Sequence, residues 1–143
     1  MKNRFKRLRF SVMFIATLVG TSATGQGLNI TIDGLRNDKG EVLVFVFDRA
    51  RPFERLNVWG AAHFAQIKAS AGQIEVTFES LNQGPYAVFL FHDENSDEDL
   101  NASDTALFEG VGATGAPRPD DDPNFAQASV MPGDVTVQVH YDQ

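Results

Sequence analysis

The chain has 143 residues, no cysteine, twelve basic and nineteen acidic residues, and a formal charge of −7 at pH 7. This length suits one domain that can bury a core without disulfides, and the lack of cysteine excludes a disulfide framework. The acidic balance disfavours nucleic acid as a partner, because phosphate groups would be repelled.

The first 25 residues show the three-part pattern of a secretory signal peptide. Five basic residues among the first nine precede an apolar run over residues 10–19, and small residues follow as far as Gly25. We predict cleavage after Gly25, with Ala23 as the alternative. A membrane-spanning helix needs about 20 apolar residues, so we expect no membrane span after cleavage. The predicted mature chain, residues 26–143, is a single periplasmic or secreted domain.

Cleavage would make the protein more acidic. Residues 1–25 hold five of the twelve basic residues and none of the nineteen acidic ones, so the charge would change from −7 to −12. Cations are the natural partners of such a surface.

Short apolar or alternating stretches run through the predicted mature chain, with turns rich in Gly, Asn, Asp and Pro between them. They cover residues 28–33, 41–48, 73–79, 87–93 and 135–141. No long helical pattern intervenes. The pattern predicts an all-β fold, an antiparallel, Greek-key-like β-sandwich of about seven strands.

Two of these stretches, residues 41–48 and 87–93, are apolar on both faces. A strand of an antiparallel sandwich usually leaves one face in water, so the second face of each needs a cover. The first candidate is the segment 51–64 of the same chain, and the alternative is a partner subunit.

One short helical segment is predicted within this cover, near residues 52–59. Pro52 suits the first position of a helix. Phe53, Leu56 and Trp59 follow at intervals of three residues, which would place them on one side of the helix, against the sheet.

An acidic stretch after residues 87–93 has the spacing of a calcium-binding loop. Oxygen-bearing side chains occupy positions one, three, five, seven, nine and twelve, namely Asp93, Asn95, Asp97, Asp99, Asn101 and Asp104. Such spacing lets one looped segment surround Ca²⁺ with oxygens, and Leu100 takes the eighth position, where an apolar residue faces the core. We therefore predict a structural site for Ca²⁺ or a related divalent cation.

The match departs from the usual calcium loop at two positions. Glu98 stands where the sharp turn favours Gly, and Asp104 where a longer, bidentate Glu is usual. The alternative is a solvated acidic turn without metal. Residues 110–124 are rich in Gly, Pro and Asp and predict one long irregular loop. Its three aspartates, residues 120–122, could complete the same site, form another, or mark a solvated bend.

Sequence motifs for catalysis are missing. The chain has no nucleophile motif and no metalloprotease motif. His140 alternates with valines and is expected to face solvent, while His92 ends a strand beside Asp93, where a hydrogen-bonded structural role is favoured. We predict that the protein is not an enzyme.

Three segments together resemble the DUF2141 family of uncharacterised bacterial secreted proteins. They read LNITIDGLRNDKGEVLVFVFD, QIEVTFESLNQGPYAVFLFHDEN and NFAQASV-PGDVTVQVHY, in this order. The family's loop typically runs D-E-N-x-N-G-x-L-D, which Asp93, Glu94 and Asn95 match; Asp97 replaces an Asn and Glu98 the Gly. The resemblance implies an exported β-sandwich, similar to transthyretin-like or carboxypeptidase regulatory-like modules, and implies no reaction.

Together these features predict an exported, non-enzymatic binding or interaction module. Its ligand could be a protein, a glycan or a small molecule held by the long loops. One alternative is a hydrolase that uses His92 and loop carboxylates. The other is a structural envelope protein that assembles through its apolar sheet faces.

Overall fold

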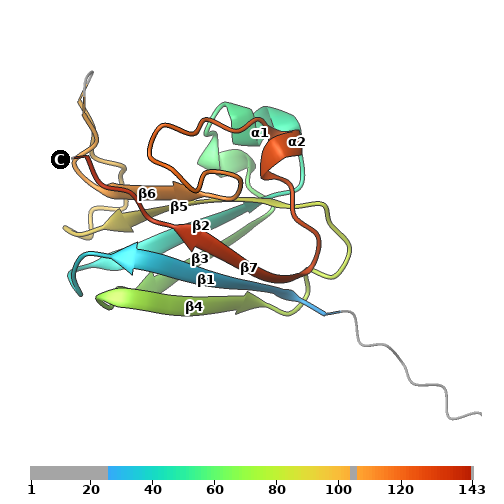
Figure 1. Cartoon of the computed structure of the whole chain (residues 1–143), viewed down its shortest axis with the longest axis horizontal. Helices are drawn as coiled ribbons and strands as arrows, with labels where there is room; N and C mark the ends of the chain where they lie inside the picture. The colour runs from blue at the N-terminus through green and yellow to red at the C-terminus, as the bar shows by residue number, and fades with distance from the viewer. Residues whose placement is uncertain (1–25, 104–105, 143) are drawn as a thin grey trace, which may run out of the picture.

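Two β-sheets packed face to face form the protein in the computed structural model, which describes residues 26–103 and 106–142 (Figure 1). Within that part, one sheet has the strand order β4-β1-β7 and the other the order β3-β2-β5-β6. The strands are β1 (Leu28–Leu35), β2 (Glu41–Phe47), β3 (His63–Lys68), β4 (Gly72–Phe78), β5 (Ala87–Asp93), β6 (Gly110–Ala113) and β7 (Gly133–Gln138). This confirms the predicted all-β sandwich. The predicted signal peptide, residues 1–25, and Asp104 lie outside the described residues.

Strand pairing is antiparallel except at one place. β1 pairs with β4 in antiparallel register and with β7 in parallel register, from Leu28 opposite Gly133 to Asp33 opposite Gln138. The other sheet is antiparallel throughout. Alternation along a strand reveals which face is buried but not the direction of its neighbour, so the parallel pair was not predicted.

Two strands occupy segments for which no strand was expected. β3 lies at the end of the predicted cover, and β6 opens the predicted irregular loop. β6 is short and carries glycines because the two sheets come close together here. A Cβ atom on Gly112 would lie 2.6 Å from the carbonyl oxygen of Gln138. Glycine weakens the hydrophobic pattern by which a strand is found.

The main core fills the space between the sheets. Leu28, Ile30 and Ile32 of β1 point into it and are at most 1% exposed, and Val44 and Leu90 are fully buried from the other side. Asn29 and Thr31, between the buried residues of β1, lie on its outer face. Period-two alternation thus places the first strand as expected.

A second core covers the outer face of the β3-β2-β5-β6 sheet. Helix α1 (Ala50–Glu54), the 3₁₀ turn η1 (Val58–Gly60) and helix α2 (Phe125–Ala128) lie over it (Figure 1). Phe53 of α1 is buried against Phe47, with ring centroids 5.7 Å apart, and Ala128 of α2 is fully buried. The chain itself supplies the cover that the doubly apolar strands require, and the predicted short helical segment is present.

The predicted contacts of Leu56 and Trp59 are wrong. Leu56 is 53% exposed and Trp59 is 96% exposed. The helix ends at Glu54, and Leu56 takes a left-handed φ of 46°. Residues at intervals of three share one face only while the helix continues. Because this helix ends directly after Phe53 and Glu54, the two later side chains turn toward solvent.

Among the described residues, no helix has the length and apolar character to cross a bilayer.

Candidate metal centre

Three carboxylates meet at the end of β5. One oxygen from each of Asp93, Asp97 and Glu109 lies within 4.8 Å of the other two. Asp93 is the last residue of β5 and Glu109 directly precedes β6. The antiparallel register, which pairs His92 with Gly110, brings Asp93 opposite Glu109 when it is continued by one residue. Sheet pairing therefore brings together two acidic side chains that no single local sequence motif contains.

The loop after β5 folds around the Asp93 carboxylate. One oxygen of Asp93 accepts a hydrogen bond from the Asp97 N–H at 3.2 Å, and the other accepts from the Glu98 N–H at 2.8 Å. Ser96 and Glu98 adopt left-handed backbone with φ of 57° and 63°. Glu98 thus takes the sharp turn of the predicted sixth position although it is not Gly.

Side-chain amides gather around Asp97. Asn95 Nδ2 donates to Asp97 Oδ2 at 2.8 Å and to Asn101 Oδ1 at 2.9 Å, and Asn101 Nδ2 donates to Asp97 Oδ2 at 3.1 Å. The Asp99 N–H donates to Asp97 Oδ1 at 3.0 Å. These hydrogen bonds lower the pKa of Asp97, and the one from the Asp99 N–H contributes most, followed by those from the two amides.

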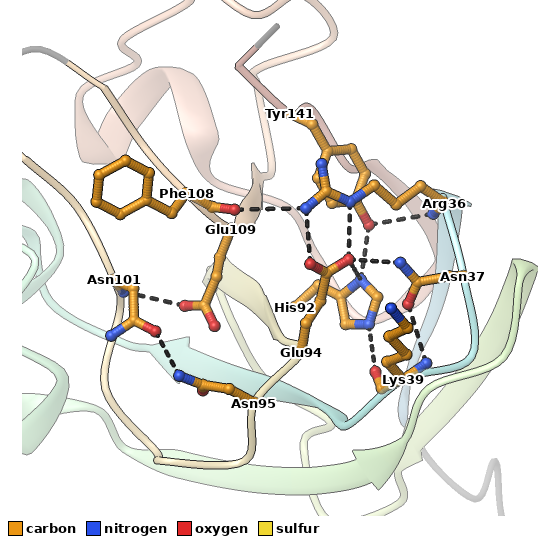
Figure 2. Close-up of polar contacts among 10 residues, drawn as sticks. All are labelled: Arg36, Asn37, Lys39, His92, Glu94, Asn95, Asn101, Phe108, Glu109 and Tyr141. Atoms are coloured by element: carbon orange, nitrogen blue, oxygen red, sulfur yellow. Dashed lines mark hydrogen bonds and ion pairs between the residues drawn. The ribbon is translucent and has the colours of Figure 1, made fainter.

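Glu109 has fewer partners than its burial demands. It is 3% exposed, and its Oε2 accepts from the Asn101 N–H at 3.0 Å (Figure 2). Its Oε1 is buried and has no hydrogen-bond partner among the described residues. Burial raises the pKa of Glu109, and the negative charges of Asp93 and Asp97 raise it further. The hydrogen-bonded Asn101 N–H opposes this rise, and so does the nearby Glu94 N–H, although the latter does not reach hydrogen-bond geometry.

The structure brings together part of the predicted ligand set. Asp93 and Asp97 belong to the three-carboxylate group, with Asn95 and Asn101 in direct contact with Asp97. The side chain of Asp99 is exposed and outside the group. Leu100 packs on the second core, as expected for the eighth position.

Glu109 was missed by the sequence prediction. It lies beyond the twelve-residue window of a calcium loop, and only the pairing of β6 with β5 brings it to Asp93. The aspartates of residues 120–122 do not belong to the group of three. Asp121 instead pairs with Arg118, with 2.9 Å between the nitrogen and the oxygen.

A second set of polar side chains, which we call the Arg36 network, lies beside Glu109 (Figure 2). It consists of Arg36, Asn37, His92, Glu94 and Tyr141. Arg36 donates twice to Glu94, at 2.7 and 2.6 Å, and Asn37 donates once at 2.6 Å. These contacts, the Arg36 hydrogen bond first, lower the pKa of Glu94 to about 2.

His92 lies fully buried in the Arg36 network. Its Nε2 is 2.7 Å from the Lys39 carbonyl oxygen and its Nδ1 is 2.7 Å from the Tyr141 hydroxyl. A carbonyl can only accept, so Nε2 carries the hydrogen, and in the neutral ring Nδ1 accepts from Tyr141. Both nitrogens are engaged, which confirms the hydrogen-bonded position predicted for His92.

His140 does not face solvent as expected. It is half-buried, and its Nε2 lies 3.2 Å from the Ala116 carbonyl oxygen. Its backbone bridges to Val111 of the opposite sheet, because the chain crosses from one sheet to the other after β7. Alternation with the valines would place His140 on the solvent-facing side of β7, but β7 ends at Gln138, before this residue.

Comparison with known proteins identifies the family alone. No curated protein and no solved structure matches the chain. A family model described as "Uncharacterized protein conserved in bacteria (DUF2141)" matches residues 30–140, which include both sheets and all three carboxylates. With most of its length matched, the chain belongs to the DUF2141 family.

Proposed function

We propose that this protein is an exported β-sandwich binding module and that its Asp93–Asp97–Glu109 cluster binds Ca²⁺ as a structural ion. The observation that carries the proposal is the buried Oε1 of Glu109, which lacks a hydrogen-bond partner among the described residues and lies beside two further carboxylates.

The energetics favour a cation at this place. A buried polar atom without a partner costs about 1–3 kcal/mol, and more when it is charged. Asp93 and Glu109 are both buried, and the oxygens of the cluster lie within 4.8 Å of one another. A divalent cation would neutralise their repulsion and give Oε1 the contact that the protein does not supply.

The ligand chemistry favours Ca²⁺ among divalent cations. The cluster and its neighbours Asn95 and Asn101 offer carboxylate and amide oxygens, without cysteine or histidine in the group. Calcium takes six to eight such oxygens in flexible geometry, and water completes the set. Zn²⁺ prefers nitrogen and sulfur, and Mg²⁺ demands a stricter octahedron.

Export supports a weak site. The signal pattern of residues 1–25 would deliver the protein to a compartment outside the cytoplasm. Extracellular calcium modules bind with a Kd of about 10⁻⁴ to 10⁻³ M. The ion would join the end of β5, the loop and the start of β6, and so hold the loop in one conformation.

Calcium binding is tested by titrating the purified, EDTA-treated protein with CaCl₂ in a calorimeter and by thermal melting. With a Kd in this range, 10 mM CaCl₂ stabilises the fold by roughly 1.4 to 2.7 kcal/mol. Asp97→Asn and Glu109→Gln should each weaken binding about tenfold or more, whereas the matched change Asp99→Asn should leave it nearly unchanged. No heat and no melting shift in the wild-type protein would sink the site.

Export is tested by fusing residues 1–25 to a reporter enzyme that is active only outside the cytoplasm. We expect reporter activity, and after expression of the full chain we expect the N-terminus of the processed protein at Gln26, or at Thr24 if cleavage follows Ala23. A reporter that stays inactive would refute the proposed export.

A further inference from the structure

A cavity of about 220 Å³ lies on the outer face of the β3-β2-β5-β6 sheet, between β5 and β6, helix α1 and the loop after β6. Phe53, Phe89, Val111 and Ala113 belong to its apolar lining, and so does Leu56, which is 53% exposed. None of the three carboxylates of the metal cluster lines it. With a water volume of about 30 Å³, the cavity is large enough for a small organic molecule.

The polar groups of this cavity are mostly acceptors. Glu54, Asp121 and Asp122 supply three carboxylates against the single guanidinium of Arg118. Arg118 is already committed to Asp121, to which its side chain donates at 2.9 Å and its backbone N–H at 2.8 Å. Among the described residues, Glu54 and Asp122 form no ion pair with a basic side chain, although Glu54 Oε1 accepts a hydrogen bond from the Phe125 N–H at 3.0 Å.

His140 extends this acceptor character. Its Nε2 lies 3.2 Å from the Ala116 carbonyl oxygen and must donate to it, because a carbonyl cannot donate. In the neutral ring, Nδ1 is then an acceptor as well. A ligand for this cavity must bring hydrogen-bond donors and positive charge, together with an apolar body for the phenylalanines.

We propose that the cavity binds a small organic cation, a primary ammonium group on an aromatic or aliphatic body. The apolar part would lie against Phe53 and Phe89, and the ammonium group would meet Asp122 and Glu54 at the mouth. Charge-assisted hydrogen bonds to carboxylates are about twice as strong as neutral ones. The net negative charge of the whole chain adds attraction for cations over anions.

The test compares three probes of similar shape: benzylammonium, benzyl alcohol and benzoate. Two-dimensional ¹H–¹⁵N NMR of the full protein, in EDTA, follows the backbone signals during each titration. We expect benzylammonium to shift signals of residues that line the cavity and to bind about tenfold more tightly than benzyl alcohol. Benzoate should bind most weakly.

Three variants locate the site. Asp122→Asn should weaken benzylammonium binding about five- to tenfold, whereas Asp120→Asn removes the same charge from the same loop outside the cavity and should change it less than twofold. Ala113→Leu should fill the cavity and abolish binding of both benzylammonium and benzyl alcohol, with folding confirmed by an intact NMR spectrum.

The result is decisive in either direction. Equal affinity for the amine and the alcohol, tighter binding of benzoate, or an equal effect of the Asp120 and Asp122 changes would overturn the proposal. So would shifts confined to residues 93–109, which would show that the amine binds at the acidic loop instead. A missing interaction with all three probes also refutes it.

Discussion

Glu94 and Glu109 lie at the same end of the β3-β2-β5-β6 sheet, the first half-buried and the second buried, yet their surroundings are opposite. Three hydrogen bonds from Arg36 and Asn37 satisfy Glu94, whose pKa falls to about 2. Glu109 receives one backbone hydrogen bond within normal geometry, and its pKa is raised. A carboxylate surrounded by donors stabilises the fold, whereas one left short of them is available to a cation.

The largest effect that we expect in the Arg36 network follows from His92→Leu. The change leaves the Lys39 carbonyl and the Tyr141 hydroxyl without their hydrogen bonds to the fully buried His92 ring. Unmet polar groups of this kind cost about 1–3 kcal/mol each, so the free energy of unfolding should fall by about 3 kcal/mol. Urea denaturation measures this, and the exposed histidine change His63→Leu should stay within about 0.5 kcal/mol of wild type.

Glu94→Gln should cost on the order of 2 kcal/mol at pH 7. The folded pKa of Glu94 is lowered from 4.5 to about 2. Its contribution is therefore fully present above pH 4.5 and is lost as the pH falls toward 2. The difference between wild type and variant in urea denaturation should shrink over that window. A constant difference would contradict the assignment, and the exposed Glu79→Gln change is the matched control.

In EDTA, Glu109→Gln should raise the free energy of unfolding, whereas the two preceding changes should lower it. Because the pKa of Glu109 is raised by burial and by Asp93 and Asp97, its charge costs stability above that pKa, and the cost disappears as the pH falls toward 4.5. Removing the charge should stabilise the metal-free protein by about 1 kcal/mol at pH 7. In 10 mM CaCl₂ the order should reverse, because the variant has lost a ligand. Destabilisation in both solutions would show that Glu109 already has a structural partner.

Much of the fold could be predicted, because a strand with one buried face alternates apolar and polar residues. Leu28, Ile30 and Ile32 mark one buried face, and the doubly apolar stretch 41–48 correctly demanded a second cover. β6 could not be predicted, because the close approach of the sheets requires Gly112 there and removes the apolar signal. Nor could the exposure of Trp59, which depends on where one short helix ends.

The candidate site divides in the same way. Local spacing identified Asp93, Asp97 and the two asparagines, because one loop holds them. Glu109 follows Asp93 by sixteen residues and meets it only through the pairing of β6 with β5, for which local spacing carries no signal. The Arg36 network likewise joins the end of β1, the end of β5 and the C-terminal segment, which only the folded sheet brings together.

The smallest effect tests how the loop reaches the conformation that gathers its carboxylates. Glu98 has a left-handed φ of 63°, which costs a residue other than glycine about 1–2 kcal/mol. Glu98→Gly removes this strain but makes the unfolded chain more flexible, at a cost of about 0.4–1 kcal/mol. The net gain in unfolding free energy should be about 0.5 kcal/mol, measured by urea denaturation in EDTA. Asp99 is not left-handed, so Asp99→Gly brings the cost without the relief and should destabilise the protein. If both changes destabilise it equally, the left-handed turn at Glu98 does not form in the metal-free loop, and the cation must shape the site as well as fill it.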